Sequence, residues 1–283
     1  MPRPRGIIYN NCIIDNTDTV SKSMLNAVND MQQKIDVNNE ELVEICKIVN
    51  TYEYVFSNVS EKEPFAIGKM NPSSNFYYEI REILNSFGLL KISRALCIGD
   101  SDIKSLFTDS ATYDLYNIII IDQTTTPIAL NNSILSSLAI GATLIIKLSN
   151  ITNKETIHFL YLLSILFEKA YIVKPSVVNI MSSDVFIVCV SFLNDGAGYA
   201  SNLDLAEIPN FFLSKIEEFN SINGHRQLDA YDQVFNMLYN KNRWQKLELL
   251  KKLNIQKSIA WCDKNNVPCN KIGDKTNMFL NNY

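Results

Sequence analysis

Five short apolar segments between residues 95 and 192 constrain the fold of this chain more than any other feature. They do not alternate apolar with polar residues, and the clearest of them is the uninterrupted run Ile118–Ile121. Strands that are apolar on both faces occur in sheets covered by helices on both sides. The five segments are Ala95–Ile98, Ile118–Ile121, Thr143–Ile146, Ala170–Val173 and Val185–Val190. The sequence therefore predicts an α/β fold around a five-stranded sheet.

The segments between these strands predict how the strands are connected. Helices fit at about 101–108, 128–139 and 154–168, so most of the sheet is expected to be parallel. The last link, residues 174–184, is too short for a crossover helix of about a dozen residues. The final strand is therefore expected to run antiparallel to the strand before it.

Helical patterns flank the predicted sheet on both sides. Residues 38–49 place apolar side chains at helical spacing behind an Asn cap, and a second helix is expected over 72–84. Beyond residue 200, further helices are expected at 208–219, 228–239, 242–253 and 255–264. We expect Trp244 and Trp261 to pin these C-terminal helices to the sheet domain. The chain is accordingly divided into an N-terminal helical segment (1–90), a sheet domain (91–195) and a C-terminal helical extension (196–283).

Composition excludes several classes of function. Lys and Arg number 26 against 30 Asp and Glu, a formal charge of −4, so nucleic-acid binding needs a local basic face. The six cysteines include no C-x-x-C and the two histidines lie far apart, so no metal site is expected. The longest apolar run, residues 156–167, is short of the roughly 20 residues that span a bilayer. These features predict a cytoplasmic protein with reduced thiols and no membrane segment.

One stretch of the C-terminal extension is clearly basic. It is either a solvated helix face or a surface for RNA or an acidic partner. Its basic residues are Lys241, Arg243, Lys246, Lys251, Lys252 and Lys257.

Three motifs follow one another in order: GATLIIKL (141–148), LFEKAYIVKP (166–175) and SSDVFIVCVSF (182–192). Together they resemble landmarks of the FtsJ-like ribose 2′-O-methyltransferases, particularly the cap-modifying members of eukaryotes and large DNA viruses. The resemblance runs from about residue 50 to residue 189, with NTYEYVF (50–56) a weaker match. It implies a Rossmann-like methyltransferase sheet, and in active members it implies methyl transfer from S-adenosylmethionine to a ribose 2′-hydroxyl.

The family uses a Lys-Asp-Lys-Glu tetrad whose second lysine deprotonates the hydroxyl, which requires neighbouring charges that lower the lysine pKa. The resemblance places Asp122 and Lys147 at the aspartate and second lysine. Asp184 stands at the glutamate position and is one methylene shorter. Glu79 stands where the first lysine belongs, which reverses its charge. The resemblance thus implies remnants of a tetrad at these four positions.

The cofactor half departs further from the family. Family members follow the first strand with a small-residue loop that approaches the cofactor closely, because glycine has no side chain. Only Gly99, followed by Asp100, remains of that loop. Fewer than twenty residues separate Gly99 from Ile118, which leaves room for one crossover but not for the family's two adenosine-binding strands. The expected sheet is therefore a truncated methyltransferase sheet of about five strands, without a bound cofactor.

These departures predict a catalytically inactive, methyltransferase-like protein. We expect it to act as a scaffold or stimulatory subunit in an RNA-capping, RNA-modifying or virion assembly, in the cytoplasm, a viral factory or the virion. Its architecture is similar to that of the small, non-catalytic subunit of the poxvirus mRNA capping enzyme. The expected partner is a subunit of a capping or RNA-modifying enzyme or a second copy of this chain, with RNA as a further candidate. The alternatives are an active, divergent mRNA cap 2′-O-methyltransferase that uses S-adenosylmethionine, or an RNA-binding module without partners.

Overall fold

A computed structural model describes residues 21–35, 39–59, 65–99, 102–107, 113–123, 132–193 and 208–270. Its elements follow the order helices, sheet, helices. In chain order they are α1 (Lys22–Gln33), α2 (Glu40–Val49), η1 (Glu53–Val55), α3 (Phe76–Ser86), β1 (Ala95–Ile98), η2 (Asp102–Leu106), β2 (Tyr116–Gln123), α4 (Asn132–Ser136), β3 (Leu138–Leu148), α5 (Lys154–Leu166), β4 (Phe167–Val173), β5 (Val185–Phe192), α6 (Asn210–Tyr239) and α7 (Arg243–Lys264).

The five predicted strands form one sheet in the order β1-β2-β3-β5-β4. β1, β2 and β3 are parallel neighbours, whereas β5 runs antiparallel to both β3 and β4. This confirms a mostly parallel five-stranded sheet with an antiparallel last strand. The short loop between β4 and β5 turns the chain back, so that β5 inserts between β3 and β4.

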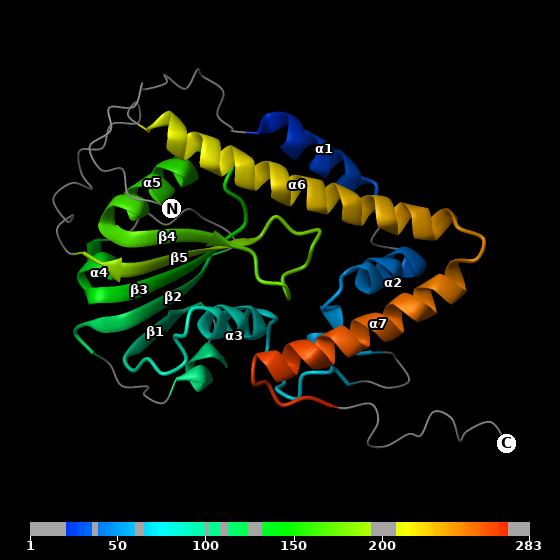
Figure 1. The fold of residues 1–283 in the computed structure, drawn as a ribbon, viewed down its shortest axis with the longest axis horizontal. Coiled ribbons are helices and arrows are strands. Elements are labelled where there is room, and N and C mark those ends of the chain that lie inside the picture. Colours follow the sequence, from blue (N-terminus) through cyan, green and yellow to red (C-terminus); the bar gives the residue numbers. More distant parts are fainter. Residues whose placement is uncertain are drawn as a thin grey trace.

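Helices cover both faces of the sheet (Figure 1). Along β2, Ile119 and Ile121 face a core shared with α5 and the first half of α6. Ile118 and Ile120 face the opposite core, which is shared with α3 and η2. The continuous apolar run of β2 is thus explained by burial on both sides.

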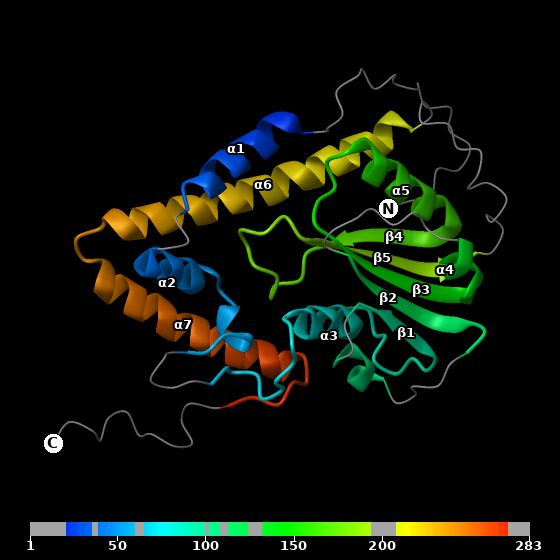
Figure 2. The ribbon, with the colours of Figure 1, turned by 180° about the vertical axis from the view of Figure 1, so that it is seen from behind.

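The remaining helices form a layer that extends beyond the sheet. In both views α6 leaves the sheet and α7 runs back towards α3 (Figures 1 and 2). α1 packs along α6, and α2 packs against both α6 and α7. The core of this layer combines residues from both ends of the chain, including Leu42, Ile45, Val234 and Leu247.

The four helices expected beyond residue 200 are two long ones, α6 and α7. The polar stretch at 220–224 does not break α6, because Gly224 lets α1 approach closely. A Cβ atom at Gly224 would lie 2.3 Å from Cγ of Met24. Asn254 likewise does not break α7: it is fully buried and its Nδ2 donates to the carbonyl of Ile48 at 2.6 Å.

Three predicted helices are shorter than expected. Of the range 128–139, α4 covers only Asn132–Ser136, and residues 128–131 lie outside the described residues. The prediction was wrong from Leu138 onwards, because Leu138 is buried in β3 opposite Tyr116. At 101–108 the described part is the 3₁₀ helix η2. Helix α5 ends at Leu166, because the buried side chain of Phe167 begins β4.

The two tryptophans differ in environment. Trp261 is buried, and its Nε1 donates to Oε2 of Glu82 in α3 at 2.9 Å, so its hydrogen bond is to the N-terminal segment, while its apolar cluster includes Val177 of the sheet domain. The prediction for Trp244 was wrong: it is 63% exposed in the first turn of α7 and lies beside Arg243. Among the helices of the described ranges, none has the length and apolar character needed to cross a membrane.

Candidate functional site

The four tetrad positions inferred from the sequence meet at one edge of the sheet. Asp122 and Lys147 lie near the carboxyl ends of β2 and β3, and they are directly paired across the two strands. Asp184 immediately precedes β5, which starts at the same edge because it runs antiparallel to β3. Glu79 reaches this edge from α3. We call these four residues the Lys147 cluster.

An ion pair lies at the centre of the Lys147 cluster. Nζ of Lys147 is 2.7 Å from Oε2 of Glu79 and 3.8 Å from Oδ2 of Asp184. The side chains of Lys147 and Glu79 are only 10% and 4% exposed, whereas that of Asp184 is 27% exposed. The ammonium is therefore bound by carboxylates inside the protein.

Glu79 is buried because of its place in α3. Its helix turns Phe76, Ile80 and Ile83 towards the sheet, and Glu79 lies among these buried residues. Burial raises the pKa of Glu79, the Lys147 ammonium lowers it, and the carboxylates of Asp184 and Asp122 raise it further. The net direction is upward, so the ammonium compensates only part of the cost of burying this carboxyl.

Two aromatic rings cover the Lys147 ammonium. Phe76 of α3 and Phe186 of β5 are stacked, with centroids 5.9 Å apart and planes at 12°. Nζ of Lys147 lies 5.5 Å from the first centroid and 5.7 Å from the second, within reach of cation–π attraction. The ammonium is thus surrounded by carboxylates and aromatic faces.

Gly99, the remaining glycine of the expected cofactor loop, is closely packed against β2. Its φ of +111° is a conformation that L side chains rarely adopt. A Cβ atom at this position would lie 2.9 Å from Cβ of Asp122 and 3.3 Å from its carbonyl oxygen. The close packing of Gly99 against Asp122 of β2 therefore explains why a glycine occupies this position. Asp100, the other residue of this loop, lies outside the described residues.

β1 is an edge strand of the sheet. In the described residues between Ile98 and Tyr116, the only helix or strand is η2, while residues 100–101 and 108–112 are not described. Ile98 at the end of β1 is 38% exposed. No described strand therefore lies beyond β1, on the side where the family resemblance implied adenosine-binding strands.

The predicted basic surface divides into two groups. Arg243 and Lys251 contact α2: Nε of Arg243 lies 2.8 Å from Oε1 of Glu41, and Nζ of Lys251 lies 3.4 Å from Oε1 of Glu44. These two contacts help hold α7 on α2. The other four basic residues are exposed: Lys241, Lys246, Lys252 and Lys257.

Two exposed leucines accompany the lysines on α7. Leu249 is 67% exposed and Leu253 is 43% exposed. Lys246, Leu249, Leu253 and Lys257 follow one another at spacings of three or four residues, which places them on one helical face. We call these four residues the α7 stripe. The sequence pattern predicted its lysines and missed its leucines, which resembled core positions of a helix.

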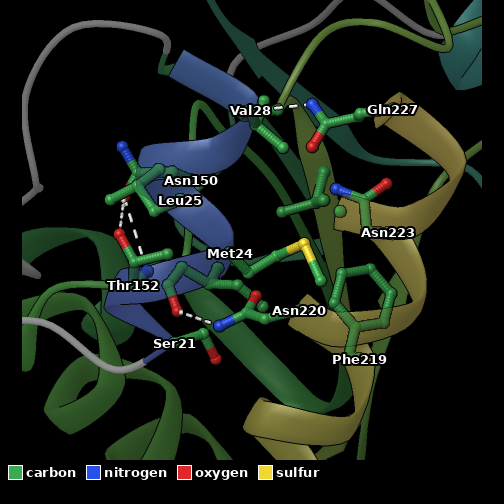
Figure 3. Close-up of a pocket in the computed structure, with 14 residues that line it drawn as sticks. Ser21, Met24, Leu25, Val28, Asn150, Thr152, Phe219, Asn220, Asn223 and Gln227 are labelled. Atoms are coloured by element: carbon green, nitrogen blue, oxygen red, sulfur yellow. Dashed lines mark hydrogen bonds between the residues drawn. The ribbon is translucent and has the colours of Figure 1, made fainter. Parts of the chain in front are cut away.

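Two cavities lie away from the Lys147 cluster. The smaller, about 40 Å³, is formed between α1, α6 and residues 150–152 (Figure 3). Met24 and Asn220 line it, and it has room for ordered water but not for a cofactor. The larger, about 240 Å³, lies where the loops after α2 and β4 meet α6. In the sequence Lys174 stands out only as part of the LFEKAYIVKP motif, and no local pattern marks Asn223 or Arg226, because α6 is placed by tertiary contacts.

Comparisons with known proteins give little further information. No protein-family model matches the chain. Over 214 residues it is 23% identical to "Uncharacterized protein R383" of Acanthamoeba polyphaga mimivirus, an alignment that covers 71% of this chain. The chain spans about half of that relative, since the alignment covers 56% of it. A solved structure titled "Alphavirus P23pro-zbd" is 12% identical with a TM-score of 0.35, covering 60% of this chain and 29% of that one.

Proposed function

We propose that this chain is a catalytically inactive, methyltransferase-like protein of viral origin that acts as a scaffold or stimulatory subunit in an RNA-capping, RNA-modifying or virion assembly. The observation that carries the proposal is the environment of Lys147. In the family, the first lysine of the tetrad places a positive charge beside the catalytic lysine, which favours loss of the catalytic lysine's proton. In this chain an acidic residue stands at that place, so the local charge is reversed and Lys147 is held in an ion pair. Glu79 occupies that place at 2.7 Å.

The cover over Lys147 supports the same proposal. A general base must come within hydrogen-bond reach of the substrate hydroxyl. Lys147 is instead 8% exposed and lies beside the stacked rings of Phe76 and Phe186. An incoming ribose would have to displace both the rings and the buried carboxylate of Glu79.

The neighbourhood of Gly99 supports the absence of a cofactor. A glycine that cradles a ligand leaves space where a Cβ would be, whereas here Asp122 fills that space. This close packing supports the proposal that no S-adenosylmethionine binds at this point. The parallel pairing of β1 with β2 and the antiparallel insertion of β5 are compatible with a methyltransferase sheet that has lost two strands.

The α7 stripe is the surface that best suits a partner. Two leucines flanked by lysines match a partner that presents an apolar seam with acidic groups at its rim. The similarity to a mimivirus protein supports the viral origin.

Calorimetry with S-adenosylmethionine and a methyl-transfer assay on capped RNA test the loss of activity. We expect no binding at millimolar cofactor and no transfer. The alternative of an active cap 2′-O-methyltransferase predicts both, with transfer lost in Lys147→Met. The double variant Glu79→Leu, Lys147→Met serves as the control that stays folded, so a loss of transfer in both variants identifies the lysine rather than unfolding.

Co-purification from infected cells tests the scaffold role. We expect an RNA-modifying or capping subunit to be recovered with the intact chain and lost with Leu249→Asp or Lys257→Glu. Ile222→Asp, at another exposed apolar position, on α6, is the matched control. Recovery of the free chain alone would overturn the scaffold proposal. Salt-dependent RNA binding that falls in Lys252→Glu without any protein partner would favour the RNA-binding module.

A further inference from the structure

The larger cavity brings together three segments that are far apart in sequence. Asn50, Thr51 and Tyr52 follow α2, Lys174 begins the loop after β4, and Asn223 and Arg226 come from α6. Among the described residues that line this cavity, none is an aspartate or glutamate, whereas two are cations.

Hydrogen bonds fix the geometry of these segments. The amide oxygen of Asn50 accepts from the backbone N–H of Ile180 at 3.4 Å, which ties the loop after α2 to the loop after β4. Nζ of Lys174 donates to Oδ1 of Asn223 at 3.1 Å and to the backbone carbonyls of Ile180 and Ser182. The cavity is therefore built by cross-links between its walls, and needs little reorganisation to accept a ligand.

The two cations of this cavity have no carboxylate in contact with them among the described residues. All three described partners of the Lys174 ammonium are neutral oxygens. Arg226 is exposed and forms no hydrogen bond or ion pair with any described residue, so its five N–H donors are available. Two carboxylates beside the cavity contact its neutral lining residues and not its cations: Glu53 accepts from Asn50 at 2.6 Å and Glu82 accepts from Ser176 at 2.5 Å.

We propose that this cavity binds the phosphate group of a small phosphorylated molecule no larger than a mononucleotide. Arg226 supplies forked donors to the phosphate oxygens, the Thr51 hydroxyl adds a neutral donor, and Lys174 supplies the positive charge behind them. A cavity of about 240 Å³ lies just below the roughly 300–1,000 Å³ of drug-sized sites, which limits the ligand to this size. Tyr52 offers an aromatic ring to a planar group on the ligand.

The pKa of Lys174 provides an independent readout. Burial is the largest cause that lowers it, to about 8; Arg226 lowers it as well, and Asp184 raises it. A bound anion favours the ammonium form, so binding near pH 8 takes up protons. At pH 6 the amine is already protonated, and the uptake disappears. A purely structural lysine would show no such coupling to the ligand.

The test is titration calorimetry of the full chain with inorganic phosphate and with adenosine, guanosine and uridine 5′-monophosphates. We expect saturable binding that is at least tenfold weaker in Arg226→Ala. Lys215→Ala, which removes an exposed cation from the same helix, is the matched control and retains binding. If a nucleotide is the ligand, it binds more tightly than inorganic phosphate, and Tyr52→Leu removes that advantage only.

Proton uptake is measured with sulfate, whose charge is constant from pH 6 to pH 8, in buffers of different ionisation enthalpy. We expect a fraction of a proton taken up per sulfate at pH 8 and almost none at pH 6. Lys174→Gln, which keeps one hydrogen-bonding side chain in place, abolishes the uptake. Absence of binding by all probes at millimolar concentration, or binding equal in Arg226→Ala and the intact chain, would overturn the proposal. Neither result depends on the inactive-methyltransferase proposal, which rests on the Lys147 cluster.

Discussion

Lys147 and Lys174 both stand at the carboxyl ends of parallel strands, β3 and β4, on either side of β5. In sequence each follows an apolar run. In the structure Lys147 contacts two carboxylates at 2.7 and 3.8 Å, whereas the described partners of Lys174 are carbonyl and amide oxygens. The same residue at equivalent ends of two strands therefore has different contacts: carboxylates at Lys147, and neutral oxygens at Lys174, which Asp184 influences only from beyond ion-pair distance.

The difference comes from the helices that face the two lysines. α3 brings Glu79 to Lys147, and its Phe76 helps cover the ammonium. α6 brings the amide of Asn223 to Lys174, together with the exposed cation Arg226. A charge neutralised within the fold has no electrostatic need for a ligand, whereas a charge held only by neutral groups beside a cavity attracts an anion. A strand-end lysine thus acquires its role from the element that packs over it.

The largest expected effect on stability is at the Lys147 cluster, where the ammonium is neutralised by carboxylates. Glu79→Ala leaves the Lys147 ammonium buried with Asp184 at 3.8 Å as its nearest carboxylate, and we expect a loss of about 3–5 kcal/mol in the free energy of unfolding. Urea denaturation measures it. Glu79→Leu combined with Lys147→Met replaces the pair with apolar groups and restores most of the loss. If Glu79→Ala loses no more unfolding free energy than the loss of a surface ion pair does, the Lys147 ammonium is not shielded from water.

The second effect tests the packing of Gly99. Gly99→Ala forces a Cβ to within 2.9 Å of Asp122 at a φ of +111°, and we expect a loss of about 2–3 kcal/mol. Gly88→Ala is the matched control: its φ is +69°, but nothing lies within 4 Å of the added Cβ, so the expected cost is about 1 kcal/mol. Equal costs in the two variants would contradict the contact between Gly99 and β2.

Much of the sheet was predictable from local pattern, because burial on both faces leaves a continuous apolar run such as Ile118–Ile121. The start of α2 was also predictable from local sequence, because its cap is a contact between residues only three apart. The side chain of Asn39 accepts from the N–H of Leu42 at 3.1 Å. The continuity of α6 was not predictable, because the need for a glycine at residue 224 comes from its contact with Met24, which is 200 residues away in sequence. Local signals cannot distinguish a glycine that ends a helix from one that lets another helix approach.

The candidate sites show the same division. Asp122 and Lys147 could be placed together because carboxyl ends of neighbouring parallel strands meet at one edge. Glu79 was found through a family resemblance, since nothing in its own helix marks it as a partner of Lys147. Arg226 could not be found, because its neighbourhood depends on where α6 lies against the loop after β4.

The third effect, on Lys174, is a pH dependence. The pKa of Lys174 is lowered to about 8 in the folded chain from its ordinary value of 10.5, so between these pH values the unfolded chain binds more protons and stability rises with pH. Over pH 8 to 9 we expect Lys174 to contribute a rise of roughly 0.5–1 kcal/mol. Subtracting the profile of Lys174→Gln isolates this slope, because the raised thiol pKa values of Cys46 and Cys262 contribute equally to both proteins. If the difference between the two stability profiles does not change with pH, the lowered pKa of Lys174 is contradicted.

The smallest effect separates distance from burial as the origin of the contrast. Nζ of Lys215 lies 2.6 Å from Oε2 of Glu218, as close as Lys147 lies to Glu79, but these side chains are 45% and 57% exposed. Water solvates both charges whether or not they meet, so Lys215→Ala should cost no more than about 1 kcal/mol, and salt should reduce that further. Urea denaturation beside Glu79→Ala makes the comparison. A loss above about 2 kcal/mol in the unfolding free energy of Lys215→Ala would mean that the distance between the charges alone sets the strength of an ion pair. The difference between Lys147 and Lys174 would then need an origin other than burial by the helices that face them.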